Sequence, residues 1–308
     1  MSTARSQLHV LLPALARDES CAELRHMRVR GDRLADAPPG YLPALTQLFQ
    51  WPGQSLPSAA LTREAACADA GTSVWLSADP AYAQADINGA RLMACGQLDM
   101  DADEAQALAR SLRPLLGDNG MLLELTTPAR WHLRLADGAK PPLFDSVEQV
   151  LGEDLLTHLP SGDIGLRWRK LFTDVQVILH QHPVNSARRQ CGQAPVNSLW
   201  FWGGGQLPAW VKSRVMRVFS ADPLTQALAA RAGLLSQPAT LALLAGFDGN
   251  GATLLDVDNS EALPAWSAAL ETWQRRHRGC ELFLYFSDGT RYRFVARHRW
   301  RCWRRLAK

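Results

Sequence analysis

The sequence predicts an α/β protein, because short apolar runs alternate along the chain with segments whose apolar residues repeat at helical spacing. The chain has 308 residues, of which 47% are hydrophobic and 20% are charged. That composition is typical of soluble globular proteins, and the length suits one large or two medium domains. No apolar run approaches the roughly 20 residues that span a bilayer, and the N-terminus lacks the features of a signal peptide. We therefore expect a cytoplasmic protein.

The first half of the chain predicts strands and helices in mixed order. Apolar runs bounded by turn residues predict strands at 8–12, 74–76, 90–95, 121–125 and 131–135. Helices are expected at 43–50, 62–71 and 101–116, the last capped by Asp101 with acidic residues in its first turn. The β-α-β-β order between 90 and 135 favours an α+β unit over a doubly wound sheet.

The second half contains the most regular helical pattern. Within 163–180, apolar residues at 164, 168, 171, 172, 175, 178 and 179 share one face, and Pro183 is expected to end this helix. Further strands are predicted at 198–202, 214–219 and 254–257, and further helices at 222–232 and 260–278. Residues 281–286 and 290–295 predict a β-hairpin around a Ser-Asp-Gly turn.

Polar residues and glycines gather between 182 and 205, in the strings His-Pro-Val-Asn and Pro-Val-Asn-Ser-Leu-Trp-Phe-Trp-Gly-Gly-Gly. Glycines after a strand allow close backbone approach, and exposed amides there can hold an anion. Pro208 stands where a dinucleotide fingerprint needs its third glycine, so no nucleotide motif is predicted. The segment is either a tight turn at a domain junction or part of a ligand site. Its candidate ligand-binding residues are His182, Asn185, Arg188, Asn197, Trp202, Gly203 and Gly205.

A second candidate polar site precedes this segment. Asp79, Asp86 and Asn88 could form it, with Arg91 nearby for a phosphate or carboxylate. The alternative is that Asp79-Pro80 starts a turn, while the other two side chains bond local backbone. No metal site and no cofactor are predicted, because the six cysteines are far apart, and His180 and His182 diverge at a helix end.

The C-terminus carries a strong excess of positive charge. Residues 291–308 hold eight basic and no acidic residues, whereas the rest of the chain has 25 basic residues against 30 acidic ones. If the last strand continues past Val295, alternation places five arginines on one face: Arg291, Arg293, Arg297, Arg299 and Arg301. This arginine stripe would meet an anionic partner, or else be an edge strand protected by charge. A small anion or a protein is the expected partner, and nucleic acid is not.

The strings between 182 and 205 resemble RpfE-type bacterial regulatory proteins and, more distantly, archaeal-type cofactor-independent phosphoglycerate mutases. The segments 78–82 and 85–88 and the terminal Arg-Cys-Trp-Arg-Arg also resemble the RpfE type, which covers the chain from about residue 73 to its end. The resemblance to the mutases is confined mainly to the middle of the chain.

The resemblance implies an alkaline-phosphatase-like, or phosphomutase-like, α/β core interrupted by an α+β insert. The core would comprise residues 1–80 and 197–308, and the insert residues 81–196. A simple two-domain chain divided near residue 140 is the alternative.

Departures from the mutase pattern decide the functional expectation. The mutases place a metal-binding Asp-Gly-x-x-Asp after their first strand, where this chain has Pro-Ala-Leu-Ala, and their Asp-His pair of metal ligands is missing. Two-metal phosphoryl transfer needs such a cluster. We therefore expect a non-catalytic regulatory or ligand-sensing protein on a degenerate mutase-like scaffold. A metal-dependent mutase or related phosphotransfer enzyme is the first alternative, and a nucleic-acid-binding protein that uses the arginine stripe is the second.

Overall fold

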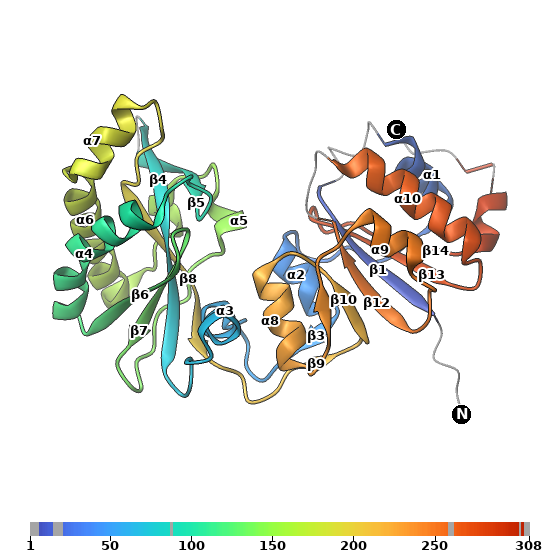
Figure 1. Ribbon diagram of the computed structural model, residues 1–308, viewed down its shortest axis with the longest axis horizontal. Coiled ribbons are helices and arrows are strands. Elements are labelled where there is room, and N and C mark those ends of the chain that lie inside the picture. Colours follow the sequence, from blue (N-terminus) through green and yellow to red (C-terminus); the bar gives the residue numbers. More distant parts are fainter. Residues whose placement is uncertain (1–5, 15–20, 87–88, 258–261, 302, 305–308) are drawn as a thin grey trace. The chain divides into compact units, whose positions relative to one another are not determined.

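The computed structural model describes residues 6–14, 21–86, 89–257, 262–301, 303 and 304. It divides into two compact units, of which unit 1 comprises Met1–Pro52 and Trp210–Lys308, and unit 2 comprises Gly53–Ala209 (Figure 1). The α/β class is confirmed. None of the helices in the described segments combines the length and the apolar character that a membrane span requires.

Unit 1 is built on a seven-stranded sheet with the strand order β11-β10-β12-β1-β13-β14-β2. The first five strands are parallel, and β14 pairs antiparallel with both β13 and β2. The strands are β1 (Gln7–Leu12), β2 (Asp32–Arg33), β10 (Arg217–Phe219), β11 (Ser236–Gln237), β12 (Ala252–Asp256), β13 (Glu281–Phe286) and β14 (Arg291–Phe294). A separate two-stranded sheet joins β3 (Phe49–Gln50) to β9 (Lys212–Ser213).

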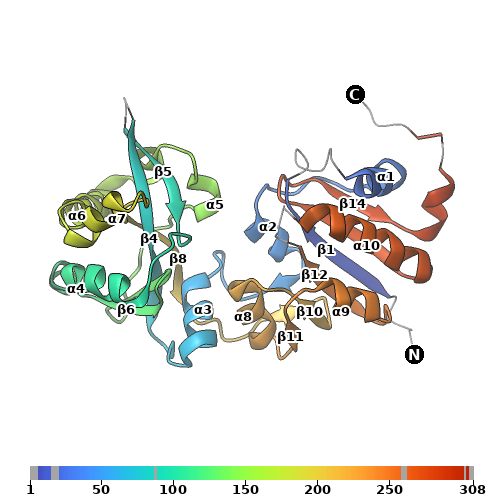
Figure 2. The ribbon, with the colours of Figure 1, turned by 45° about the horizontal axis from the view of Figure 1, so that its top comes forward.

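The helices of unit 1 cover both faces of this sheet (Figure 2). They are α1 (Ala22–Arg30), α2 (Tyr41–Thr46), α8 (Pro223–Arg231), α9 (Leu241–Gly246), α10 (Leu263–Arg276) and the 3-10 turn η4 (Ala296–Trp300). Alternate strand residues such as Leu8, Val10 and Leu12 pack against apolar residues of α1, α9 and α10 in one core cluster. The other residues of these strands therefore face the opposite side, where α2 and α8 contribute side chains.

Unit 2 is an α+β structure whose five-stranded sheet is antiparallel throughout. Its strands are β4 (Val74–Asp86), β5 (Gly89–Cys95), β6 (Met121–Thr127), β7 (Arg130–Leu135) and β8 (Ser198–Gln206). Its helices are α3 (Ser58–Cys67), α4 (Ala102–Asp118), α5 (Val147–Val150), the 3-10 turn η2 (Leu155–His158), α6 (Gly162–His180) and α7 (Pro183–Gln190). Figures 1 and 2 show α4, α6 and α7 on one side of this sheet and α3 on the other.

Strand β4 is the centre of unit 2. It pairs with β8 along one side from Val74 to Ala81, and along the other side first with β7 and then with β5. Pro80 lies where the partner changes, because β7 pairs only as far as Ser77 and the pairing with β5 begins at Ala81. The Pro80 carbonyl accepts from Gly96 N on that side. The missing proline N–H therefore falls in a gap of the ladder, between the pairing with β7 and the pairing with β5.

The expected domain boundaries at 80 and 197 differ from the units of the structure. Residue 80 lies inside β4, and residue 197 directly precedes β8. Because β4 and β8 are hydrogen-bonded neighbours, they belong to the same unit, and the division falls at 52/53 and 209/210.

Candidate functional site

The topology of unit 1 points to one edge of its parallel sheet. The chain leaves β10 through α8 toward β11, whereas it leaves the neighbouring β12 through α10 toward β13 on the far side of β1. The two connections thus diverge between the carboxyl ends of β10 and β12. In open α/β sheets, such a switch point is where ligands bind.

A group of polar side chains lies at this position. Asp256, the last residue of β12, accepts hydrogen bonds at Oδ2 from Tyr41 of α2 and from Ser220, which follows β10, both at 2.5 Å. The Tyr41 hydroxyl is also 2.6 Å from the Thr225 hydroxyl of α8. Burial and the carboxylates of Asp222 and Asp256 raise the pKa of Tyr41 well above its usual value. Tyr41 therefore acts as a neutral hydrogen-bond donor.

His9 and Tyr285 extend the group across the same face of the sheet. The register pairs Leu11 with both Asp256 and Tyr285, so these three residues form one row across β12, β1 and β13. His9 lies two residues before Leu11, and its Nδ1 is 2.9 Å from the Tyr285 hydroxyl. We call His9, Tyr41, Ser220, Thr225, Asp256 and Tyr285 the carboxyl-edge cluster.

The protonation states of this cluster follow from burial and from nearby cations. Burial, with a smaller effect of Arg214, lowers the pKa of His9 to about 4. Burial raises the pKa of Tyr285 to about 12, and Arg291 and Arg214 oppose that shift. His9 and Tyr285 are therefore both neutral at pH 7. Asp256 lies among these neutral donors at the strand ends.

The residues present do not fit the two-metal centre that a phosphomutase would need. Across the described segments, no group of three or more His, Cys, Asp or Glu side chains could hold a metal ion. Asp256 directs one carboxylate oxygen at two hydroxyls, which already occupy lone pairs that a metal would need. No chemical step through a metal follows from this arrangement.

The candidate residues predicted in unit 2 are only partly brought together. Asp79 and Trp202 are in contact, because Trp202 Nε1 donates to Asp79 Oδ2 at 2.9 Å. The same carboxylate pairs with Arg130 at 2.9 Å and accepts from Trp131 N at 3.2 Å. Burial raises the pKa of Asp79, an effect that the three donors oppose. We call Asp79, Arg130, Trp131 and Trp202 the strand-junction cluster, because it fills the gap in the ladder beside Pro80.

Other predicted residues bind the backbone of their own unit. Asn185 bonds the carbonyls of Leu179 and Val196, and Asn197 bonds both backbone groups of Ala83. Arg188 is buried and pairs with Glu104 at 2.7 Å. Asn185 and Arg188 therefore stabilise the region around α7, whereas Asn197 joins the start of β8 to β4.

His182 caps α7, since its Nδ1 accepts from Val184 N. The helix predicted at 163–180 ends at His180, before Pro183, and the proline then begins α7 at a position where its missing N–H costs nothing.

The remaining polar candidates of unit 2 lie near the end of β4. Asp86 and Arg91 form an exposed ion pair at 2.7 Å, and Asn88 lies outside the described residues. The expected turn at Asp79-Pro80 is not formed, because β4 continues through it.

The glycines after Trp202 have the close approach that the sequence predicted. Gly203 has a φ of 64°, and a Cβ there would lie 1.8 Å from Ser58 Oγ. Gly205 has a φ of 153°, and its Cβ would lie 2.8 Å from Pro57 Cβ. The glycines are therefore required for packing β8 against α3.

The arginine stripe expected at the C-terminus is not formed. Strand β14 ends at Phe294, and the chain turns into η4 instead of continuing as a strand. The arginines bind different parts of unit 1: Arg291 donates to Ala35 O and Gln47, Arg293 pairs with Glu281 at 2.6 Å, and Arg301 pairs with Asp32 at 2.5 Å. Arg297 and Arg299 belong to η4. This correction removes the geometric basis for a cationic face.

Comparison with known proteins finds partial and distant sequence matches to phosphoglycerate mutases. It is 26% identical over 172 residues to the 2,3-bisphosphoglycerate-independent phosphoglycerate mutase of Methanosarcina barkeri, which is 51% of this chain and 42% of the mutase. It is 37% identical over 59 residues to a probable mutase of the same kind from Geobacter sulfurreducens, or 19% of this chain and 15% of that protein. The matches span less than half the length of these relatives. No protein-family model matches the chain.

A solved structure supports the fold over nearly the whole chain. The PH0037 protein from Pyrococcus horikoshii superposes with a TM-score of 0.51 at 11% identity, covering 95% of this chain and 88% of that one. Together these findings establish distant homology to cofactor-independent phosphoglycerate mutases. They give no support to the expected RpfE type or to a regulatory role. They favour the mutase-like alternative instead.

Proposed function

We propose that this protein recognises a small phosphorylated hydroxy acid of the phosphoglycerate kind at the carboxyl edge of the unit 1 sheet. The observation that carries this proposal is the coincidence of two features. The chain is homologous to phosphoglycerate mutases, and its buried polar side chains gather at the sheet edge where α/β folds bind ligands. An alkaline-phosphatase-like core in unit 1 is part of the same proposal.

Arg214 supplies the positive charge for the phosphate. Its side chain is exposed, and its charge acts on both His9 and Tyr285, which places it beside the carboxyl-edge cluster. Among the described residues, no carboxylate forms an ion pair with Arg214. A guanidinium group can bind two phosphate oxygens at once. The hydroxyls of Tyr41 and Tyr285 are the nearby donors for the hydroxyl and carboxylate groups of the ligand.

Binding of 3-phosphoglycerate, measured by calorimetry, tests this proposal. We expect saturable binding of 3-phosphoglycerate and much weaker binding of glycerate, which differs only by lacking the phosphate. Arg214→Gln should weaken 3-phosphoglycerate binding at least tenfold. Arg276→Gln, an exposed arginine at the end of α10, is the matched control and should leave it unchanged. Equal affinity for both ligands, or no binding, would contradict the proposal.

Turnover is a separate measurement on the same protein. Conversion of 3-phosphoglycerate to 2-phosphoglycerate can be followed by phosphorus NMR, with added manganese and with a chelator. Formation of 2-phosphoglycerate would extend the proposal from recognition to phosphotransfer. Because the described residues do not supply a two-metal centre, we expect the purified protein to hold no stoichiometric divalent metal.

A further inference from the structure

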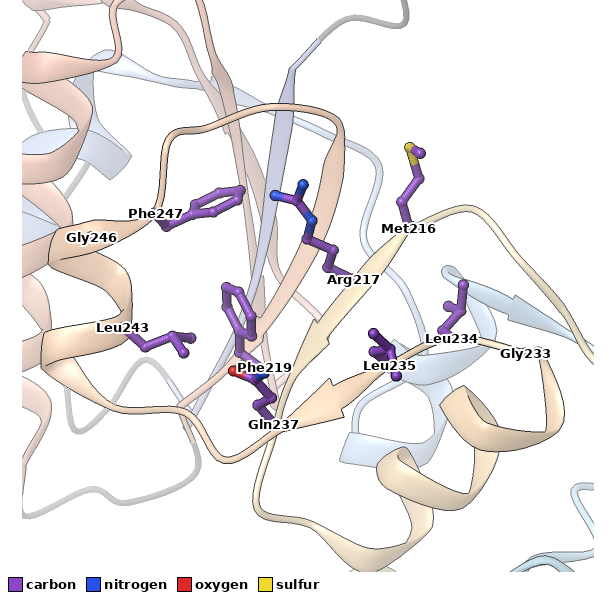
Figure 3. A pocket seen from close by; sticks show the side chains of 10 residues that line it. All are labelled: Met216, Arg217, Phe219, Gly233, Leu234, Leu235, Gln237, Leu243, Gly246 and Phe247. Atoms are coloured by element: carbon purple, nitrogen blue, oxygen red, sulfur yellow. The ribbon is translucent and has the colours of Figure 1, made fainter.

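Unit 1 contains a pocket of about 650 Å³ that the proposed function does not use (Figure 3). It lies between the β10–β11 edge of the sheet and helix α9. Apolar side chains form most of its lining, including Phe219, Leu235, Leu243 and Phe247. The volume is within the range of pockets that bind small organic molecules, roughly 300–1,000 Å³.

The pocket opens on the opposite face of β10 from the carboxyl-edge cluster. Strand residues alternate between faces, so Arg217 and Phe219 face one side, while Val218 and Ser220 face the other. Phe219, Phe247 and Leu244 belong to the main apolar core, so the pocket continues that core to the surface. It is therefore a second site, independent of the phosphate-binding proposal.

Apolar surface is exposed around the pocket. Leu235 is 85% exposed and Met216 is 63% exposed, and both line the opening. The neighbouring β11 has only two residues and forms the edge of the sheet. A ligand of suitable size would cover this surface and gain the free energy of apolar burial.

Arg217, which lines the pocket, would favour a ligand that carries an acidic group. The Arg217 guanidinium lies 5.7 Å from the centre of the Phe247 ring, and Figure 3 shows its side chain directed toward that ring. Its ion pair with Asp248 is long, at 3.5 Å, and the Asp248 carboxylate also accepts from Asn250 N and Asn250 Nδ2. By comparison, Arg293 and Arg301 pair with carboxylates at 2.6 and 2.5 Å. Arg217 thus keeps donors available for an acidic group of a ligand.

We propose that this pocket binds a small organic anion with an aromatic or branched apolar body, whose acid group pairs with Arg217. The body of the ligand lies against Phe219, Phe247 and Leu243. The acid group lies at the rim, where Arg217 is half-exposed and a charged group keeps part of its hydration.

A pair of fluorescent probes separates the two parts of this proposal. 1-Anilinonaphthalene-8-sulfonate has an aromatic body and an acid group, and N-phenyl-1-naphthylamine has the same body without the acid. We expect the full-length protein at pH 7.5 to bind one sulfonate per chain. Arg217→Gln should weaken binding of the sulfonate at least tenfold and leave the affinity for the neutral probe within twofold. Arg276→Gln should change neither.

A second variant tests the location of the apolar body. Gly246 lines the pocket, has no positive φ, and a Cβ there would meet no atom within 4 Å, so Gly246→Leu places a side chain in open space. It should weaken both probes at least fivefold without lowering the melting temperature. Gly117→Leu, another helical glycine with no atom within 4 Å of a Cβ, is the control and should change neither affinity.

Three results would overturn the proposal: no saturable binding of either probe, sulfonate affinity that survives Arg217→Gln, or probe affinities that survive Gly246→Leu. None of them bears on phosphoglycerate binding, which uses Arg214 near His9 and Tyr285.

Discussion

Asp79 in unit 2 and Asp256 in unit 1 are both buried, and each accepts hydrogen bonds from several donors. The donors differ in kind between the two aspartates. In unit 2, Asp79 is bound by a cation, an indole N–H and a backbone N–H. In unit 1, Asp256 is bound by the hydroxyls of Tyr41 and Ser220. The donors of Asp79 are fixed by strands β7 and β8, whereas hydroxyl groups can rotate to new partners. The first arrangement therefore suits a structural bridge, and the second suits a site that exchanges partners with a ligand.

The largest effect should come from removing the structural bridge. Asp79→Ala leaves the Arg130 charge and two N–H donors without their acceptor, in a place that water reaches poorly. Breaking a buried ion pair in this way costs about 3–5 kcal/mol. Chemical denaturation should therefore show a loss of that size in the free energy of unfolding. A loss below about 1 kcal/mol would mean that Asp79 does not hold the strand junction together.

Acidification should weaken both units through their buried histidines. His9 in unit 1 has a pKa lowered to about 4, and His132 in unit 2 has a pKa lowered to about 3, in both cases chiefly by burial. In the unfolded chain these two histidines take up protons near pH 6.5, whereas in the folded protein they remain neutral at that pH. The contribution of the neutral histidines to the free energy of unfolding is therefore fully present above about pH 6.5. It is lost as the pH decreases toward 4, by about 3 kcal/mol for His9 alone.

Denaturation curves between pH 7.5 and 4 measure this loss. His9→Phe should reduce the pH dependence, since it removes one of the buried groups that the fold keeps neutral, and the exposed His26→Gln should not change it. A pH dependence that is the same in His9→Phe as in the unchanged protein would show that His9 is not held neutral by the fold.

Removing the carboxylate of the carboxyl-edge cluster should cost less than removing Asp79. Asp256→Ala leaves two neutral hydroxyls without their acceptor, and such groups cost about 1–3 kcal/mol. The same variant should also change 3-phosphoglycerate binding, because the hydroxyls lose their orientation. If Asp256→Ala destabilises the protein as much as Asp79→Ala, the two clusters do not differ in the way described.

The smallest effect concerns the C-terminal arginines. Arg293→Gln removes a partly exposed pair with Glu281 and should cost at most about 1 kcal/mol. Since the arginine stripe is not formed, electrophoretic assays at low salt should show no binding of duplex DNA or RNA. Salt-sensitive binding that Arg293→Gln and Arg297→Gln together abolish would restore the nucleic-acid hypothesis.

Local patterns in the sequence predicted much of the fold. The helix expected at 163–180 is α6, because its apolar residues repeat with the helical period, and the hairpin at 281–295 is β13 and β14. The same approach missed α1 and α7 and ended β4 too early. Pro80 lies within β4 and Pro183 begins α7, because a proline disrupts a strand or helix only where its missing N–H is needed.

The carboxyl-edge cluster could not be predicted in the same way. Tyr41, Ser220 and Asp256 lie on three elements that meet only through the sheet register, and none of them is part of a sequence motif. One signal was present, namely that Ser220 directly follows the strand predicted at 214–219 and Asp256 lies within the strand predicted at 254–257. By contrast, the residues chosen between 182 and 205 formed a visible motif, yet Asn185 and Asn197 bind the backbone of unit 2.

The short pairing of β3 with β9 brings together the two points where unit 1 is interrupted. Gln50 lies opposite Lys212 in antiparallel register, so the two points where unit 1 is interrupted are adjacent strand ends. A tight turn between Pro52 and Trp210 would close unit 1 as an ordinary hairpin. Unit 2 therefore occupies the place of a hairpin loop, where loss or gain of a whole module leaves the register of the host unchanged. Unit 2 itself is one continuous stretch of chain, Gly53–Ala209, so a single internal deletion would remove it and leave unit 1.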